Sequence, residues 1–115
     1  MVASDIDPLA FAAIEMNAAA NTVFIEPIAN DLIGANGRWN IIVAGDMCYE
    51  RPLAERLIAW LRTLAAQGAL VLLGDPKRNY FPEGGVECIA TYSVPTSLDL
   101  EDREVRETSV YRLLP

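Results

Sequence analysis

The chain has 115 residues, of which 52% are hydrophobic, and a formal net charge of −7. This length allows one domain with a buried core, and the composition is that of a globular protein rather than a disordered one. The acidic balance argues against non-specific binding to nucleic acid, which needs a basic surface. No stretch approaches the length of about 20 apolar residues that a membrane span needs, and no signal-peptide pattern is present. We therefore expect neither nucleic acid nor a membrane among its partners.

Histidine is absent from the sequence, and the two cysteines, Cys48 and Cys88, lie far apart. Without imidazole the chain cannot form a Ser-His or Cys-His nucleophile pair, and no metal site is expected. Two distant cysteines without a secretory signal predict reduced thiols and a cytoplasmic location. Cys48 has no base to activate it, so we interpret it as a packed small side chain rather than a nucleophile.

The first third of the chain predicts a strand, a helix and a second strand. A short strand at Val2 to Asp5 is followed by Asp7, a good helix N-cap. The helix is expected from Pro8 to about Ala20, with proline at its first position and an apolar stripe wide enough to pack well into the body. Thr22 to Glu26 predicts the second strand, closed by Pro27.

The most informative stretch follows a polar, glycine-containing loop at Asn30 to Arg38. Ile41 to Val43 is an unbroken apolar run that predicts a strand buried on both faces, as in the interior of a parallel sheet. Gly45 ends the run, and Asp46 and Tyr49 follow. Ligands of open α/β sheets bind beyond the carboxyl ends of the strands, so this acid and this ring are candidates for chemistry. The pattern alone slightly favours the alternative, a loop acid and a half-buried ring.

A second crossover follows. Residues from Pro52 to Gly68 predict a helix, and Ala69 to Leu73 predicts another all-apolar strand, closed by Gly74 and Asp75. Asp75 repeats the position of an acid after a strand, although a turn residue is its simplest interpretation. The alternation of strands and helices indicates βαβ units and a parallel sheet.

The last third changes character. Glu87 to Val94 and Val105 to Leu113 carry strand-forming residues on either side of the charged stretch Asp99 to Glu104. Two strands joined in this way predict an antiparallel hairpin. The predicted fold class is therefore α/β, with a mostly parallel sheet that ends in an antiparallel hairpin.

Polar side chains also follow the first two predicted strands. Asp5 lies between the first strand and the helix, where an acid in nucleotide-binding α/β folds accepts both ribose hydroxyls. A plain turn residue is an equally good interpretation of Asp5. Asn30 and Asp31 lie in the loop after the second strand, where they are placed either to reach an adenine or to cap the loop.

Four motifs, in order along the whole chain, resemble those of S-adenosylmethionine-dependent methyltransferases with a Rossmann-like fold. Ser4 to Ala10 resembles the motif at the family's second strand, and Ala44 to Tyr49 resembles the Asp-x-x-Tyr motif of its lysine methyltransferase branch. Gly74 to Arg78 and Thr108 to Tyr111 resemble the same branch. Within this family the chain resembles the electron-transfer-flavoprotein β-subunit lysine methyltransferases, and it resembles the bacterial nicotinamide N-methylase-like proteins more strongly still.

The resemblance implies a seven-strand sheet, S-adenosylmethionine as cofactor, and roles for particular residues. Asp46 would line the pocket near the transferred methyl group, and Tyr49 would shape the amine site. The acceptor would be a lysine side chain of a protein substrate, with a small-molecule amine as the alternative. The residues implied to bind the cofactor, with Asp5 on the ribose, are Asp5, Ile6, Asn30, Asp31 and Gly45.

The family's first strand, its glycine-rich turn and the helix behind it would precede Asp5. We therefore expect residues 1–115 to be the C-terminal portion of a single methyltransferase domain, truncated or completed elsewhere, and do not expect it to methylate by itself. The alternatives are an inactive methyltransferase remnant acting as an interaction module, and an unrelated α/β nucleotide-binding domain. A sheet lacking a central strand would leave two unpaired edges, through which the chain could self-associate or accept a strand from another chain.

Overall fold

The computed structural model describes residues 1–37, 39–95 and 105–115, and the chain forms two compact units, Met1–Ala35 and Asn36–Pro115. The charged stretch predicted between the last two strands lies outside the described residues. The prediction that the chain is a portion of one methyltransferase domain stays a prediction.

The first unit is a single βαβ crossover. Strand β1 (Val2–Ser4) and strand β2 (Glu26–Ile28) pair in parallel, and helix α1 (Pro8–Ala20) connects them. Asp7 caps the helix as predicted, because its carboxylate accepts a hydrogen bond from the backbone N–H of Leu9 at 2.9 Å. The predicted helix is confirmed at both ends.

Two predictions for this unit are wrong. The second strand begins at Glu26 rather than at Thr22, which has a φ of 53° in the turn after the helix. Pro27 lies inside the strand rather than closing it. The strand tolerates proline there because its neighbours make the bonds: the N–H of Glu26 donates to the carbonyl of Met1, and the carbonyl of Ile28 accepts the N–H of Asp5, on either side of β1.

Helix α1 is also less buried than predicted. Ala18 is its one buried residue, whereas the side chains of Leu9 and Met16 are largely exposed. A two-stranded sheet of three-residue strands is too small to cover more than one side of a four-turn helix. The predicted apolar stripe is also wrong, because apolar residues lie all round α1 rather than on one side, and this unit does not supply a surface that covers them.

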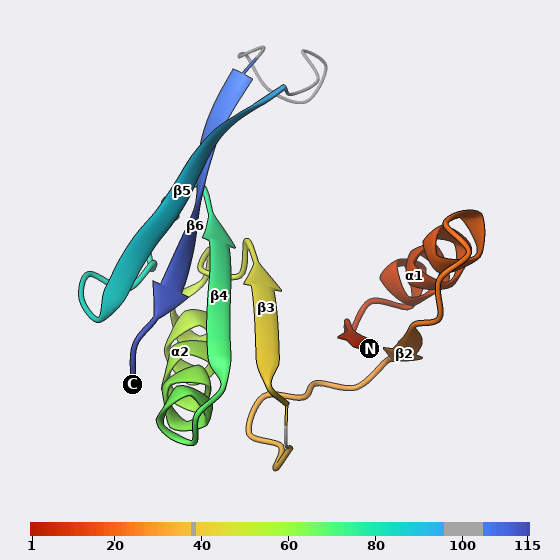
Figure 1. The fold of residues 1–115 in the computed structure, drawn as a ribbon, viewed down its shortest axis with the longest axis horizontal. Coiled ribbons are helices and arrows are strands. Elements are labelled where there is room, and N and C mark those ends of the chain that lie inside the picture. The colour runs from red at the N-terminus through yellow and green to blue at the C-terminus, as the bar shows by residue number, and fades with distance from the viewer. Residues whose placement is uncertain (38, 96–104) are drawn as a thin grey trace. The chain divides into compact units, whose positions relative to one another are not determined.

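The second unit is a four-stranded mixed sheet with the strand order β3-β4-β6-β5 (Figure 1). Strands β3 (Ile41–Gly45) and β4 (Leu70–Asp75) are parallel, whereas β6 (Val105–Leu113) runs antiparallel to β4 and to β5 (Val86–Pro95). The predicted crossover and the predicted antiparallel hairpin are both confirmed.

Helix α2 (Arg51–Ala66) supplies the core of this unit by packing on one face of the sheet (Figure 1). Its apolar residues recur every three or four positions and therefore form one buried stripe. Gly68, with a φ of 103°, ends the helix in the left-handed conformation that the sequence indicated. The buried core contributed by α2, β4 and β6 consists of Ala54, Leu57, Leu61, Leu64, Val71, Leu73, Tyr111 and Leu113.

The prediction that β3 is buried on both faces is wrong. The side chains of Ile41 and Val43 are 61% and 73% exposed, whereas Ile42 and Ala44 on the alternate face are partly covered. Among the described residues β3 pairs with β4 alone, and α2 covers only one side of the sheet. An all-apolar run indicates that both faces can be buried, but not that this unit provides the cover.

Strands β5 and β6 continue past the end of β4. The last residue of β4, Asp75, pairs with Ser109, whereas β5 and β6 remain paired through Glu107, Arg106 and Val105 (Figure 1). This extension places residues of β6 beside the loops that leave β3 and β4.

Candidate functional site

The carboxyl ends of β3 and β4 lie side by side. Gly45 is in register with Gly74, so Asp46, which follows β3, and Asp75, the last residue of β4, lie at the same edge of the sheet. The two loops are hydrogen-bonded to each other: the N–H of Asp46 donates to the carbonyl of Gly74 at 2.8 Å, and the N–H of Tyr80 donates to the carbonyl of Cys48 at 3.2 Å. The loops therefore form one connected rim.

Asp46 is held by a bidentate ion pair with Arg78. Nε of Arg78 lies 2.7 Å from Oδ1 of Asp46, and Nη2 lies 2.9 Å from Oδ2. The hydrogen bonds from Arg78 lower the pKa of Asp46, partial burial opposes them, and the positive charges of Arg78 and Arg106 add to the lowering. Asp46 is therefore a firmly ionised carboxylate whose two oxygens are both fixed.

Asp75 has a different environment from Asp46. Its side chain is buried, with 2% of the residue exposed, and Oδ2 accepts the backbone N–H of Arg78 at 2.7 Å. Oδ1 has no hydrogen-bond partner among the described residues. Burial raises the pKa of Asp75, and the backbone N–H groups of Arg78 and Lys77 oppose that rise. The predicted turn role is confirmed, because this carboxyl closes the turn that carries Arg78.

Both loops contain a residue in the left-handed backbone region. Asp46 has a φ of 49° and Lys77 a φ of 66°. Such conformations cost non-glycine residues about 1–3 kcal/mol each and persist where surrounding bonds enforce them. Here the hydrogen bonds within the rim enforce them, which places strain at the point where the candidate side chains converge.

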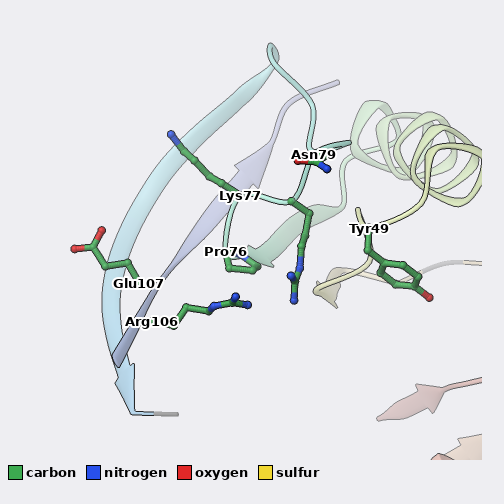
Figure 2. A pocket seen from close by; sticks show the side chains of 7 residues that line it. Tyr49, Pro76, Lys77, Asn79, Arg106 and Glu107 are labelled. Carbon is green, nitrogen blue, oxygen red and sulfur yellow. The ribbon is translucent and has the colours of Figure 1, made fainter. Parts of the chain in front are cut away.

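A pocket of about 570 Å³ opens against this rim. Figure 2 shows Tyr49 on one side, from the loop after β3, and Arg106 and Glu107 on the other, from the extended part of β6. Arg106 extends toward the ends of β3 and β4, in agreement with its electrostatic effect on Asp46. The lining residues are Tyr49, Pro76, Lys77, Arg78, Asn79, Arg106 and Glu107.

Cys48 lies in the same loop as Asp46 and is buried. Its burial, and then the charges of Asp75 and Asp46, raise the pKa of its thiol to about 11. The thiol is therefore protonated near neutral pH. The interpretation of Cys48 as a packed small side chain is confirmed.

The remaining candidates lie in the first unit, at the carboxyl end of its parallel pair of strands. Asp5 follows β1, and its N–H donates to the carbonyl of Ile28 in β2 at 3.1 Å. The hydroxyl of Ser4 donates to the carbonyl of Asn30 at 2.7 Å. The structure thus brings Asp5 and Asn30 to one end of this small sheet.

The acids of the first unit are exposed. Oδ1 of Asp5 accepts the N–H of Asp7 at 2.9 Å, and its second oxygen has no hydrogen-bond partner among the described residues. Oδ1 of Asp31 accepts the N–H of Ile33 at 2.9 Å. Ile6 is also exposed. Asp5 therefore serves the predicted turn and keeps an oxygen that can accept a ligand hydroxyl, so both interpretations fit its geometry.

The sequence singled out Gly45, Asp46 and Tyr49, which the structure places at or beside this rim, but it did not single out Arg78 and Arg106. A signal for Arg78 was present in the motif that contains it, yet nothing in the pattern paired it with Asp46, 32 positions away. Arg106 had no signal, because its position depends on the register between β6 and β4. No cluster that could hold a metal ion, and no helix long and apolar enough to cross a membrane, occurs in the described part of the chain.

The sequence is similar over its whole length to electron transfer flavoprotein beta subunit lysine methyltransferases. The identity is 36% to the Xenopus laevis protein, covering 100% of this chain and 50% of that protein. It is 34% to the Danio rerio protein, covering 97% and 46%, and 31% to the Homo sapiens protein, covering 100% and 47%. The chain thus spans about half the length of these curated relatives. No protein-family model matches it.

The fold is similar to solved methyltransferase structures. N-methyltransferase NodS from Bradyrhizobium japonicum superposes with a TM-score of 0.61 at 13% identity, covering 99% of this chain and 73% of that one. Magnesium protoporphyrin IX methyltransferase from Synechocystis, solved with bound SAM, gives a TM-score of 0.60 at 13% identity, covering 97% and 58%. The predicted fold class and the predicted resemblance to methyltransferases are confirmed.

Proposed function

We propose that the chain carries part of an S-adenosylmethionine-dependent N-methyltransferase site that acts on lysine side chains of a protein. The observation that carries the proposal is the fixed carboxylate of Asp46, followed by Tyr49, at the carboxyl end of a parallel strand in a methyltransferase fold. The relatives' names, which specify lysine methylation of a flavoprotein subunit, support the class of acceptor. A small-molecule amine is the second choice of acceptor.

Each of the predicted cofactor-binding residues is considered within its own unit. The exposed carboxylate of Asp5 has an oxygen available for hydroxyl groups, and we assign it to the ribose. Asn30 and Asp31 are assigned to the adenine side, and Ile6 and Gly45 to contacts along the cofactor. S-adenosylmethionine, when bound, supplies a methyl group on a positively charged sulfur, which makes that methyl group open to attack by an amine.

The protein's own residues would orient the amine. The amine nitrogen would use its lone pair to accept the methyl group that the cofactor supplies, the sulfur would keep the electrons of the broken bond, and the methylated amine would lose a proton to solvent. Oxygens of Asp46 can accept an N–H of the incoming amine, and the exposed ring of Tyr49 can contact its alkyl chain. Alignment of this kind supplies most of the acceleration expected for such a displacement, and it needs no histidine.

Calorimetric titration of the folded 115-residue chain with S-adenosylmethionine tests the cofactor assignment. We expect saturable binding that is lost in Asp5→Ala. Glu15→Ala, which removes an exposed acid from α1, is the matched control and should bind as the unchanged protein does. Asp5→Asn keeps an acceptor for the Asp7 N–H and so separates loss of the ribose contact from loss of the turn. Absence of binding by a folded, monomeric chain would contradict the proposal.

The alternative of an interaction module that pairs with another chain has one observation in its favour. The face of β3 that carries Ile41 and Val43 is apolar and exposed in its own unit. Sedimentation of the unchanged chain and of Val43→Thr tests it. Self-association that the substitution weakens, together with no cofactor binding, would favour this alternative.

The cytoplasmic location also stays a proposal, supported by two cysteines that form no disulfide.

A further inference from the structure

Three charged groups on the rim form a chain of contacts from the protein interior to the pocket. The buried carboxyl of Asp75 accepts the backbone N–H of Arg78. The guanidinium of Arg78 in turn binds the carboxylate of Asp46. We propose that Arg78, aimed by Asp75, is a positioning residue that presents Asp46 to the acceptor amine as an oriented, charge-neutralised carboxylate. This inference rests on the proposed function of Asp46.

The bidentate geometry fixes the direction of Asp46. Nε and Nη2 of Arg78 each contact a different oxygen, at 2.7 and 2.9 Å, so the carboxylate plane cannot turn without breaking a bond. Each carboxylate oxygen can accept more than one hydrogen bond, which leaves capacity for the N–H of an amine. A lone aspartate that is half exposed on a loop would instead sample several rotamers.

The ion pair also changes the form of amine that the site favours. A bare carboxylate would stabilise a lysine ammonium, which has no lone pair for attack and an ordinary pKa of about 10.4. Asp46 paired with Arg78 carries no net charge, and Arg106 adds positive charge close enough to affect Asp46. An approaching ammonium therefore meets a neutralised pair rather than a bare carboxylate, whereas a neutral amine can still donate an N–H to the carboxylate oxygens. The pair favours the reactive form.

Asp75 determines where the Arg78 side chain starts. Its Oδ2 holds the Arg78 N–H at 2.7 Å, and the preceding Lys77 adopts the left-handed conformation that this turn requires. Because the carboxyl is buried, the turn is anchored to the core rather than to solvent. Asp75 holds Arg78 in place through this turn and also interacts with Asp46 by charge, so the two effects need separate tests.

The first experiment measures the pKa of Asp46 in the full chain by carbon NMR of its side-chain carboxyl. We expect Arg78→Gln to raise that pKa toward the ordinary aspartate value, and Arg106→Gln to raise it less, because Arg106 acts by charge without a hydrogen bond. Arg112→Gln, on an exposed β6 side chain away from the rim, is the matched control and should leave it unchanged. An unchanged pKa in Arg78→Gln would overturn the proposal.

The second experiment separates two effects of Asp75 on Asp46: the positioning of Arg78 and the direct effect of the Asp75 charge. Asp75→Asn keeps an oxygen that can accept the Arg78 N–H, so the pKa of Asp46 should stay low. Asp75→Ala removes the acceptor, so that pKa should rise. Removing the negative charge of Asp75 would by itself lower the pKa of Asp46. A rise in the pKa of Asp46 therefore shows that Arg78 is no longer held in position. Should Asp75→Ala fail to fold, a rise in Asp75→Asn as large as that in Arg78→Gln would still overturn the aiming role.

A third measurement separates this inference from the proposed function. Methyl transfer to a lysine peptide is followed against pH in the presence of S-adenosylmethionine. We expect the rise of kcat with pH, which reports the bound amine, to shift to higher pH in Arg78→Gln. Because the chain alone is not expected to methylate, absence of transfer leaves the proposed function to be decided by the cofactor titration and the positioning role by the NMR result. If the pH profile of methyl transfer is the same in Arg78→Gln as in the unchanged protein, the role assigned to the pair of Asp46 and Arg78 would be overturned.

Discussion

The two units of the chain are built from the same βαβ pattern but differ in what they bury. The first unit has one buried residue, Ala18, whereas in the second unit α2, β4 and β6 surround a core that includes Leu61 and Val71 at 0% exposure. The comparison teaches that an apolar helix contributes to stability only where a neighbouring sheet is broad enough to cover it. Most of the stability within this chain is therefore expected to come from the second unit.

The largest difference in stability between the units is expected when a leucine is replaced by alanine in each of the two helices. Leu61→Ala removes a fully buried side chain and should lower the free energy of unfolding by about 2–5 kcal/mol. Leu9→Ala changes a residue that is 80% exposed and should alter it by less than about 0.5 kcal/mol. Urea unfolding followed by circular dichroism measures both. Similar losses for the two variants would break the comparison between the units.

A smaller effect is expected at the helix N-caps. Here the substitution in the first unit should cost more stability than the substitution in the second unit. Asp7 accepts the N–H of Leu9, so Asp7→Ala should destabilise α1 by about 1 kcal/mol. Glu50 makes no side-chain cap bond to α2, and Glu50→Ala should have almost no effect. Hydrogen exchange of the helix amides reports each helix separately. Faster exchange in α2 after Glu50→Ala would show that the cap contributes where no bond is seen.

The smallest effect is expected from the exposed ion pair of the second unit. The pKa of Asp46 is lower in the folded chain than in the unfolded one, so its contribution is present above the unfolded pKa and lost as pH falls through the folded pKa. Because both side chains are partly solvated, Arg78→Gln should cost only about 0.2–1 kcal/mol at pH 7. The difference from the unchanged protein should vanish in acid. Urea unfolding at both pH values measures this, and a persistent difference in acid would assign the loss to packing.

Local chemistry in the sequence was sufficient for several elements. Asp7 and Pro8 marked the start of α1, and Gly68 marked the end of α2, because caps and left-handed glycines depend on neighbours along the chain. Pro27 misled the prediction of β2. Whether proline interrupts a strand depends on which edge its missing N–H would face, and this is set by pairing with β1 rather than by the local sequence.

The candidate site was predictable only in part for the same reason. Asp46 and Tyr49 follow directly from the end of an apolar strand, which the sequence shows. Arg78 and Arg106 join them only through the pairing of β3 with β4 and of β4 with β6. The exposed face at Val43 was missed because burial depends on which neighbours are present, and an apolar run reports only what could be covered.

The continuation of β5 and β6 past the end of β4 gives the pocket two walls that differ in stiffness. On the side of β3 and β4, the wall is braced by a helix-covered sheet and by cross-bonded loops. On the other side, Arg106 and Glu107 stand on a two-stranded ribbon past the last β4 pair, where each strand has one neighbour. A ribbon bends more easily than a sheet. Under the proposed function, this difference assigns adjustment to acceptors of different width to the Arg106 wall and a fixed geometry to the Asp46 wall.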